Sequence, residues 1–247
     1  MNLAAKSKHF IKTLVPAKVI QSRLHKRVFM QFAEKMGMVY FGYVDQRHDE
    51  HRLVRGLTVS AQHRDNHYCI GSFEGYDMTL VERTDTIHFP GKPAKNHNWI
   101  VMVFDLHTAI DLPHIFVGLH THSETFYAHL FTKFAQLTRV PLGTFGAHSS
   151  HFVNKYAVYT SPSQLVEAEQ LLTPAVTKVI AESFGSLTIE ISEGCLYVYA
   201  EHQRPTVQLL EKMLRCGSWL ARVLDAEPTQ PATPRPTDEP GGYISIG

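Results

Sequence analysis

The stretch of the chain that most resembles a chemical site is GLHTHSETFYAHLF, at residues 118–131. It places His120, His122 and His129, together with Glu124, within ten positions. Side chains two residues apart in a strand point to the same face, so the His-x-His pair can present two imidazoles to one metal ion. Glu124 or His129 could add a third ligand, but the helix expected after the strand sets these two on different sides.

Two further histidines could join this group if neighbouring strands align. Sixteen histidines occur in the chain, and His107 and His114 lie just upstream, in FDLHTAIDLPH. The candidate metal ligands are therefore His107, His114, His120, His122, Glu124 and His129. One hypothesis is a zinc-dependent hydrolase that uses four of these residues, His107, His114, His120 and His122. We favour the other interpretation, in which the histidines line the margin of a sheet and no cofactor is bound.

Other catalytic patterns are incomplete. Ser149-Ser150-His151 stands alone, and the sequence has no GxSxG, GxGxxG or GxxxxGK[ST] motif. We therefore assign no catalytic residues and expect a protein that is not an enzyme.

The composition excludes several classes of protein. Lys and Arg total 24 against 23 acidic residues, a net charge of +1, so we expect no nucleic-acid partner. Three scattered cysteines are too few for a disulfide framework. No apolar run approaches the ~20 residues that cross a bilayer, and no secretory signal is recognisable. These features predict a cytoplasmic protein.

The segment 1–37 predicts a basic amphipathic helix. Residues 1–33 carry a charge of +7, and apolar residues recur every four positions between Ile20 and Met36. The helix could lie on an anionic membrane, which is our second alternative for the function, or bind a partner. We favour docking of its apolar face on the rest of the chain. The basic residues of this candidate surface are Lys12, Lys18, Arg23, Lys26 and Arg27.

From Met38 the apolar period changes to that of strands. Six short segments rich in β-branched and aromatic residues alternate with polar or Gly/Pro turns. They are MVYFGYV, LVRGLTVSA, HYCIGSF, YDMTLVERT, NWIVMVFDL and HIFVGL. Residues 38–147 therefore predict an antiparallel β-meander that ends in a short helix capped by Ser123.

Residues 148–225 predict the order β-α-α-β-β-α, packed on the first half. The alternation in LTIEIS and CLYVYAEH, on either side of Glu193-Gly194, gives this hairpin an apolar face. We expect the final helix, from Thr206 to Leu224, to cover that face.

Residues 226–247 contain five prolines and predict a disordered tail. Tyr243, Ile244 and Ile246 near its end could add an edge strand to this protein or to a partner. The interpretation that we favour is a frayed terminus.

As a whole, the chain resembles a widespread group of bacterial α+β proteins of unknown function, over residues 38–225. The likeness rests on FGYVDQ, CIGSFEGYDMTLVER, HNWIVMVFDL, LPHIFVGL, NKYAVYTS, LLTP and GSWLARVL. Members of that group commonly carry a basic or membrane-anchored N-terminal segment, and the resemblance implies no catalysis. We thus expect an α+β interaction or scaffold module for a protein partner that the sequence does not identify.

Overall fold

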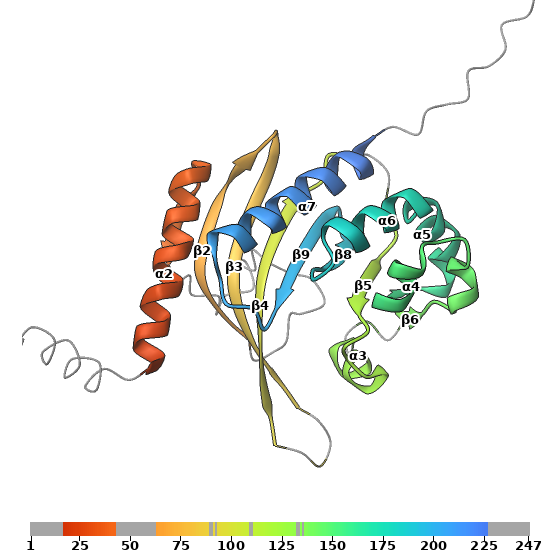
Figure 1. Cartoon of the computed structure of the whole chain (residues 1–247), viewed down its shortest axis with the longest axis horizontal. Coiled ribbons are helices and arrows are strands. Elements are labelled where there is room, and N and C mark those ends of the chain that lie inside the picture. The colour runs from red at the N-terminus through yellow and green to blue at the C-terminus, as the bar shows by residue number, and fades with distance from the viewer. Residues whose placement is uncertain are drawn as a thin grey trace, which may run out of the picture.

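The centre of the molecule is a nine-stranded sheet in the order β1-β2-β3-β4-β9-β8-β5-β7-β6, with every neighbouring pair antiparallel (Figure 1). The expected α+β class is confirmed. The structure, a computed structural model, describes residues 17–42, 63–88, 91, 93–108, 111–131, 134 and 136–226. The predicted strand LVRGLTVSA, Lys12 and the tail with Tyr243, Ile244 and Ile246 lie outside these residues.

The strands are β1 (Val39–Gly42), β2 (Arg64–Phe73), β3 (Tyr76–Ile87), β4 (Lys95–Asp105), β5 (Ile115–Leu119), β6 (Thr138–Arg139), β7 (Tyr156–Thr160), β8 (Thr188–Ser192) and β9 (Cys195–Glu201). The helices are α2 (Ala17–Met36), α3 (Glu124–Leu130), α4 (Ser150–Lys155), α5 (Leu165–Leu171), α6 (Pro174–Ser183) and α7 (Val207–Asp225), with single turns η2 (Leu142–Phe145) and η3 (Pro162–Gln164).

The hairpin β8–β9 lies in the middle of the sheet, between β4 and β5. Strand β4 pairs with β9 from Trp99 opposite Glu201 to Asp105 opposite Cys195, and β5 pairs with β8 and β7. Among the described strands, the consecutive order of a meander is present from β1 to β4, but it is wrong after β4, because β5 lies beside β8 and β7. Alternation predicts which face of a strand is covered but not which strand lies beside it. Both predicted halves therefore contribute strands to one sheet.

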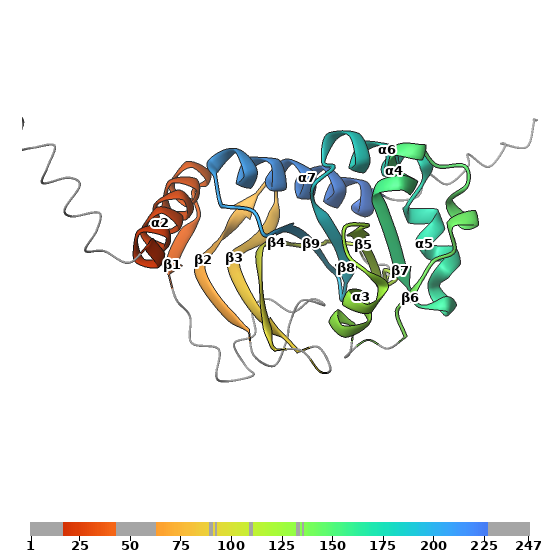
Figure 2. The same cartoon turned by 60° about the horizontal axis from the view of Figure 1, so that its bottom comes forward.

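The helices α2, α6 and α7 lie along one face of this curved sheet, and α3 lies on the other (Figure 2). The core under the first face joins Phe29 and Phe32 of α2 and Leu210 of α7 to Phe104 and Val198 of the sheet. The predicted covering of the β8–β9 hairpin by the final helix is confirmed. No helix within the described ranges is long and apolar enough to span a membrane.

Helix α2 occurs where the sequence predicts a helix, and Val28, Phe32 and Met36 of the expected stripe pack on the core, but Leu24 does not. Phe29, Phe32 and Ala33 are buried, whereas Leu24 is 57% exposed. A spacing of four residues advances by about 400°, so each step drifts about 40° around the helix. Leu24 has drifted two steps from Phe32 and points away from the sheet.

Helix α7 crosses β4 at a glycine. A Cβ atom built on Gly217 would lie 1.9 Å from Cε2 of Phe104, and Phe104 is fully buried. The absence of a side chain at Gly217 thus lets the helix approach the sheet.

Gly217→Ala should therefore destabilise the protein, although alanine is the better helix former by ~1 kcal/mol. We expect a loss of ~2 kcal/mol in the free energy of unfolding from overpacking against Phe104. Urea denaturation measures it, with Arg215→Ala, at an exposed position two residues away on α7, as the control that changes stability by less than ~0.5 kcal/mol. A Gly217→Ala protein as stable as the parent would contradict the close approach.

Candidate functional site

The second face of the sheet, turned away from α2 and α7, carries buried polar residues among aromatic ones. Its buried aromatic side chains include Tyr68, Trp99, Phe116, Tyr159, Tyr197 and Tyr199, partly covered by Phe126, Tyr127 and Phe131 of α3 and the residue after it. Arg83, Asp85, His97 and Glu190 are polar and buried on the same face. A sheet face that served only as an apolar core would not carry this many ionisable groups.

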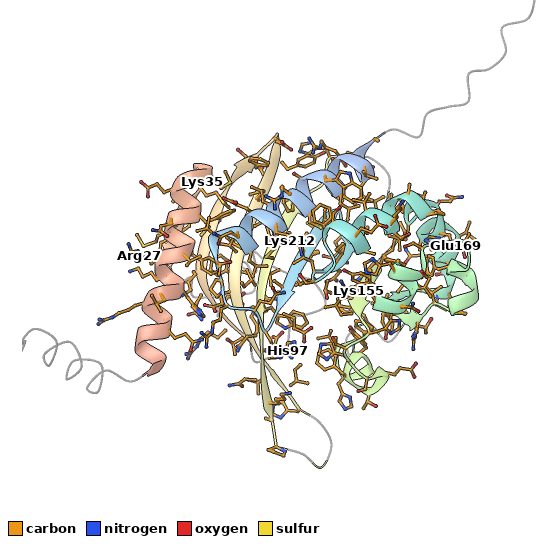
Figure 3. The ribbon with its side chains drawn as sticks, viewed as in Figure 1. Arg27, Lys35, His97, Lys155, Glu169 and Lys212 are labelled. Carbon is orange, nitrogen blue, oxygen red and sulfur yellow. The ribbon has the colours of Figure 1, made fainter. Side chains whose placement is uncertain are left out.

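His97, His122 and Glu201 come together at one end of this face. One ligand atom from each lies within 4.8 Å of the other two. Oε1 of Glu201 is 2.6 Å from Nε2 of His97 and 2.5 Å from Nε2 of His122. His97 lies on β4, toward the lower end of the sheet in Figure 3, and Glu201 is the last residue of β9.

The turn that carries His122 is fixed at both ends. The N–H of His120 donates to the carbonyl of Lys155, and Oη of Tyr127 donates to the carbonyl of Leu119. Oγ of Ser123 accepts from the N–H of Phe126, so the predicted cap of α3 is confirmed. The imidazole of His122 stacks on Phe126, with ring centroids 4.0 Å apart.

The contacts around Glu201 are short but do not have the angles of hydrogen bonds. Nε2 of His97, Nε2 of His122 and Oε1 of Glu201 are all buried, and none has a partner in hydrogen-bond geometry. Burial alone would raise the pKa of Glu201, but the two imidazoles more than offset it and hold the pKa below its usual value. Glu201 is therefore a carboxylate at neutral pH.

His202 lies beside this group. Its Nε2 is 3.9 Å from Oε1 of Glu201, and its ring centroid is 4.1 Å from that of His97. A cavity of about 150 Å³ opens here, lined by Ile87, Lys95, His97, His122, Phe126 and His202.

The structure does not bring the predicted metal ligands together. His114 precedes β5 and His120 follows it, so they lie roughly 20 Å apart at opposite ends of the strand. The alignment of adjacent strands that would have brought His107 and His114 to His120 does not occur. It failed because β9 and β8 separate β4 from β5.

Each of the dispersed residues has its own surroundings. His114 lies 3.0 Å from the buried carboxylate of Glu190, which also accepts from Tyr199. His107 stacks on Tyr76, with ring centroids 4.9 Å apart. Glu124 pairs with Arg139 at 2.7 Å, and Nδ1 of His129 lies 2.7 Å from the carbonyl of Thr125. These four side chains therefore have ordinary contacts on the surfaces of the sheet and the helices.

Sequence reasoning identified His122 but missed His97 and Glu201. The segment around His97 follows two prolines and a glycine and predicts a loop, whereas β4 already begins at Lys95. Glu201 lies over a hundred residues away, and only the register of β4 with β9 reveals their contact.

A second histidine pair attaches α2 to the sheet. Nδ1 of His25 is 2.7 Å from Oε1 of Glu82, and Nε2 of His67 is 3.5 Å from its Oε2. Burial lowers the pKa of His67.

The apolar side of α2 packs within the protein, as we favoured, while Arg23, Lys26 and Arg27 are exposed. Figure 3 shows Arg27 on the outer side of α2.

A buried ion pair lies nearby on the second face. Nε of Arg83 donates to Oδ1 of Asp65 at 2.7 Å, and its Nη2 donates to Oδ2 at 2.6 Å. Arg83 is 0% exposed and Asp65 is 4% exposed. Such a pair is costly to break, because either charge would stay buried without its main counter-charge.

No protein-family model matches the chain, and no curated protein matches it. Among solved structures, the mycobacterial trehalose monomycolate transport factor A, TtfA, has a similar fold. The TM-score is 0.56 at 12% sequence identity, over 84% of this chain and 98% of that chain. At this identity the likeness establishes a shared fold.

Arg83→Met should lower the free energy of unfolding by ~3–5 kcal/mol, because it leaves the Asp65 carboxylate buried. The control is Arg139→Met, which breaks the more exposed pair with Glu124 and should cost less than ~1 kcal/mol. Urea denaturation of both variants compares them. Equal losses would contradict the burial of the Arg83 pair.

Proposed function

We propose that this protein is a non-enzymatic binding module whose second sheet face holds a segment of a protein partner. The observation that carries the proposal is a groove at the end of that face away from His97. Its volume is about 650 Å³, and it is lined by Ile70, Gly71, Ser72, Asp77, Met78, Thr79, Val103, Asp105, Glu193, Cys195 and Tyr197. We call these residues the edge groove.

The edge groove combines an apolar floor with carboxylates. Ile70, Val103 and Tyr197 lie on neighbouring or nearby strands of the same face, whereas Asp77 and Asp105 stand at the strand ends. The lining contains no Lys, Arg or His. A partner segment that is both basic and apolar matches this chemistry.

The groove continues onto an exposed edge strand. Val39 of β1 lies opposite Ile70 of β2. Val39 is 58% exposed and Phe41 is 54% exposed. Because Tyr40 packs against the core on the helix-covered face, alternation directs the Val39 side chain to the second face. Exposed apolar side chains beside a groove are typical of an interaction surface.

The thiols support a role without covalent catalysis. Burial raises the pKa of Cys69 to about 12 and that of Cys216 to about 12. Burial, with the nearby carboxylate of Asp105, raises the pKa of Cys195 to about 11. All three are therefore protonated and weakly nucleophilic at neutral pH. We also propose a cytoplasmic location, which the occurrence of these residues as free thiols supports.

The fold supports the same reading. TtfA is described as a transport factor, and a shared fold is compatible with a role in which this protein binds other components.

The hydrolase alternative has less support, because its four histidines are dispersed and the cavity at His122 holds about 150 Å³, below the ~300 Å³ of ordinary ligand pockets. Membrane attachment would depend on the outer face of α2, where Leu24 and Met30 are exposed.

Site-specific photocrosslinking in the producing cells tests the proposal. A benzophenone amino acid placed at Val39 or at Ser72 of the edge groove should give a discrete adduct with the same protein. The matched control is Val166 of α5, which is 63% exposed on another surface and should give none. Adducts of equal yield at all three positions, or none at Val39 and Ser72, would contradict the proposal.

Charge neutralisation then tests the chemistry of the partner. Asp77→Asn with Asp105→Asn should reduce the Ser72 adduct by about threefold or more, since each exposed charge contributes up to ~1 kcal/mol. Glu167→Gln with Glu169→Gln on α5 should leave the yield unchanged. If the yield of the Ser72 adduct is the same after Asp77 and Asp105 are neutralised, the partner does not recognise these carboxylates.

A further inference from the structure

We propose that His97, His122 and Glu201 bind one divalent transition-metal ion, for which zinc is the test ion, and that this ion fixes the turn before α3 to the sheet. We call these three residues the metal centre. The inference is independent of partner binding at the edge groove, which lies at the other end of the same face.

The donors come from three elements that are far apart in sequence. His97 is on β4, Glu201 ends β9, and His122 is in the turn between β5 and α3. Their side chains are 3%, 8% and 21% exposed, respectively. Ligands delivered by separate, hydrogen-bonded elements are held in place before the ion arrives, which favours binding.

The three contacting atoms are not arranged as in an ordinary ion pair. In an ordinary His–Glu pair, an N–H points at a carboxylate oxygen. Here both Nε2 atoms lie within 2.6 Å of the same Oε1, yet all three buried atoms are without a hydrogen-bond partner. Buried polar atoms are seldom left this way, and a bound cation would satisfy all three.

The donor set selects the kind of ion. Imidazole nitrogen and carboxylate oxygen suit zinc and other first-row transition metals, and two histidines with one glutamate form a known zinc ligand set. Magnesium and calcium prefer oxygen ligands and should bind poorly. The carboxylate of Glu201 also supplies a negative charge within the centre, while Lys95 at the cavity wall is exposed to solvent.

His202 lies beside the centre, although it is not one of the three residues whose ligand atoms lie within 4.8 Å of one another. Its Nε2 is 3.9 Å from Oε1 of Glu201, and it has a positive φ of 49°. The adjoining cavity of about 150 Å³ has room for a few waters, each of which takes ~30 Å³, but not for a typical substrate. The ion therefore has a structural role, joining β4 and β9 to the turn before α3.

Zinc titration of protein stripped with a chelator tests the proposal. We expect one zinc per chain by calorimetry and mass spectrometry, no comparable uptake of magnesium, and a Tm raised by roughly 5–10 °C when free zinc is ~100 times Kd. Cobalt(II) in place of zinc should give the intense visible absorption of a four- or five-coordinate ion. Absence of stoichiometric zinc binding by the folded protein overturns the proposal.

Variants locate the ion. His122→Ala should weaken zinc binding by ~100-fold or more, since even outer-shell changes cost 10–100-fold. The matched control, His120→Ala in the same turn, should bind zinc as the parent does. His202→Asn, which tolerates the positive φ, should weaken binding less than His122→Ala.

Glu201→Gln keeps the size of the side chain and separates loss of binding from loss of folding, as circular dichroism and thermal unfolding of the metal-free proteins will show. If His122→Ala and Glu201→Gln are both folded and bind zinc like the parent, the ion lies elsewhere and the proposal is wrong.

Discussion

The antiparallel pairing of β4 with β9 is the contact on which the rest of the structure depends. It joins a strand from the early part of the chain to the last hairpin, and it places β8 and β9 between β4 and β5. The register sets Trp99 opposite Glu201, which brings the Glu201 carboxylate to the imidazole of His97, two residues earlier on β4. A slip by one residue would turn Glu201 to the helix-covered face. The order of the sheet and the metal centre thus follow from one register.

The second face that this register builds has different chemistry at its two ends. The metal centre lies where β4 begins and β9 ends, and the edge groove lies about 25 Å away, where β4 ends at Asp105. Between them, Arg83 is paired with Asp65 within the sheet. A buried ion pair of this kind adds little net stability over an apolar pair but is costly to break. In the account that we propose, the ion would fix one end of the face, and the groove beside exposed Val39 would be the end that meets a partner.

Local sequence patterns predicted the elements well and their neighbours poorly. The α+β class, the final helix over the β8–β9 hairpin and the Ser123 cap all follow from short-range periodicity and capping. The order of strands does not, because alternation carries no information on pairing partners. For the same reason the sequence pointed to His122 but grouped it with His107, which follows β4, and with His114, which precedes β5. Its true neighbours, His97 and Glu201, were hidden by long-range register.

Anomalous X-ray diffraction at the zinc edge, on crystals of the zinc-loaded protein, tests the central claim most directly. The account predicts one strong peak within ~2.2 Å of Nε2 of His97, Nε2 of His122 and a carboxylate oxygen of Glu201. A peak at other histidines, or an ordered metal centre with no anomalous signal at saturating zinc, would contradict it.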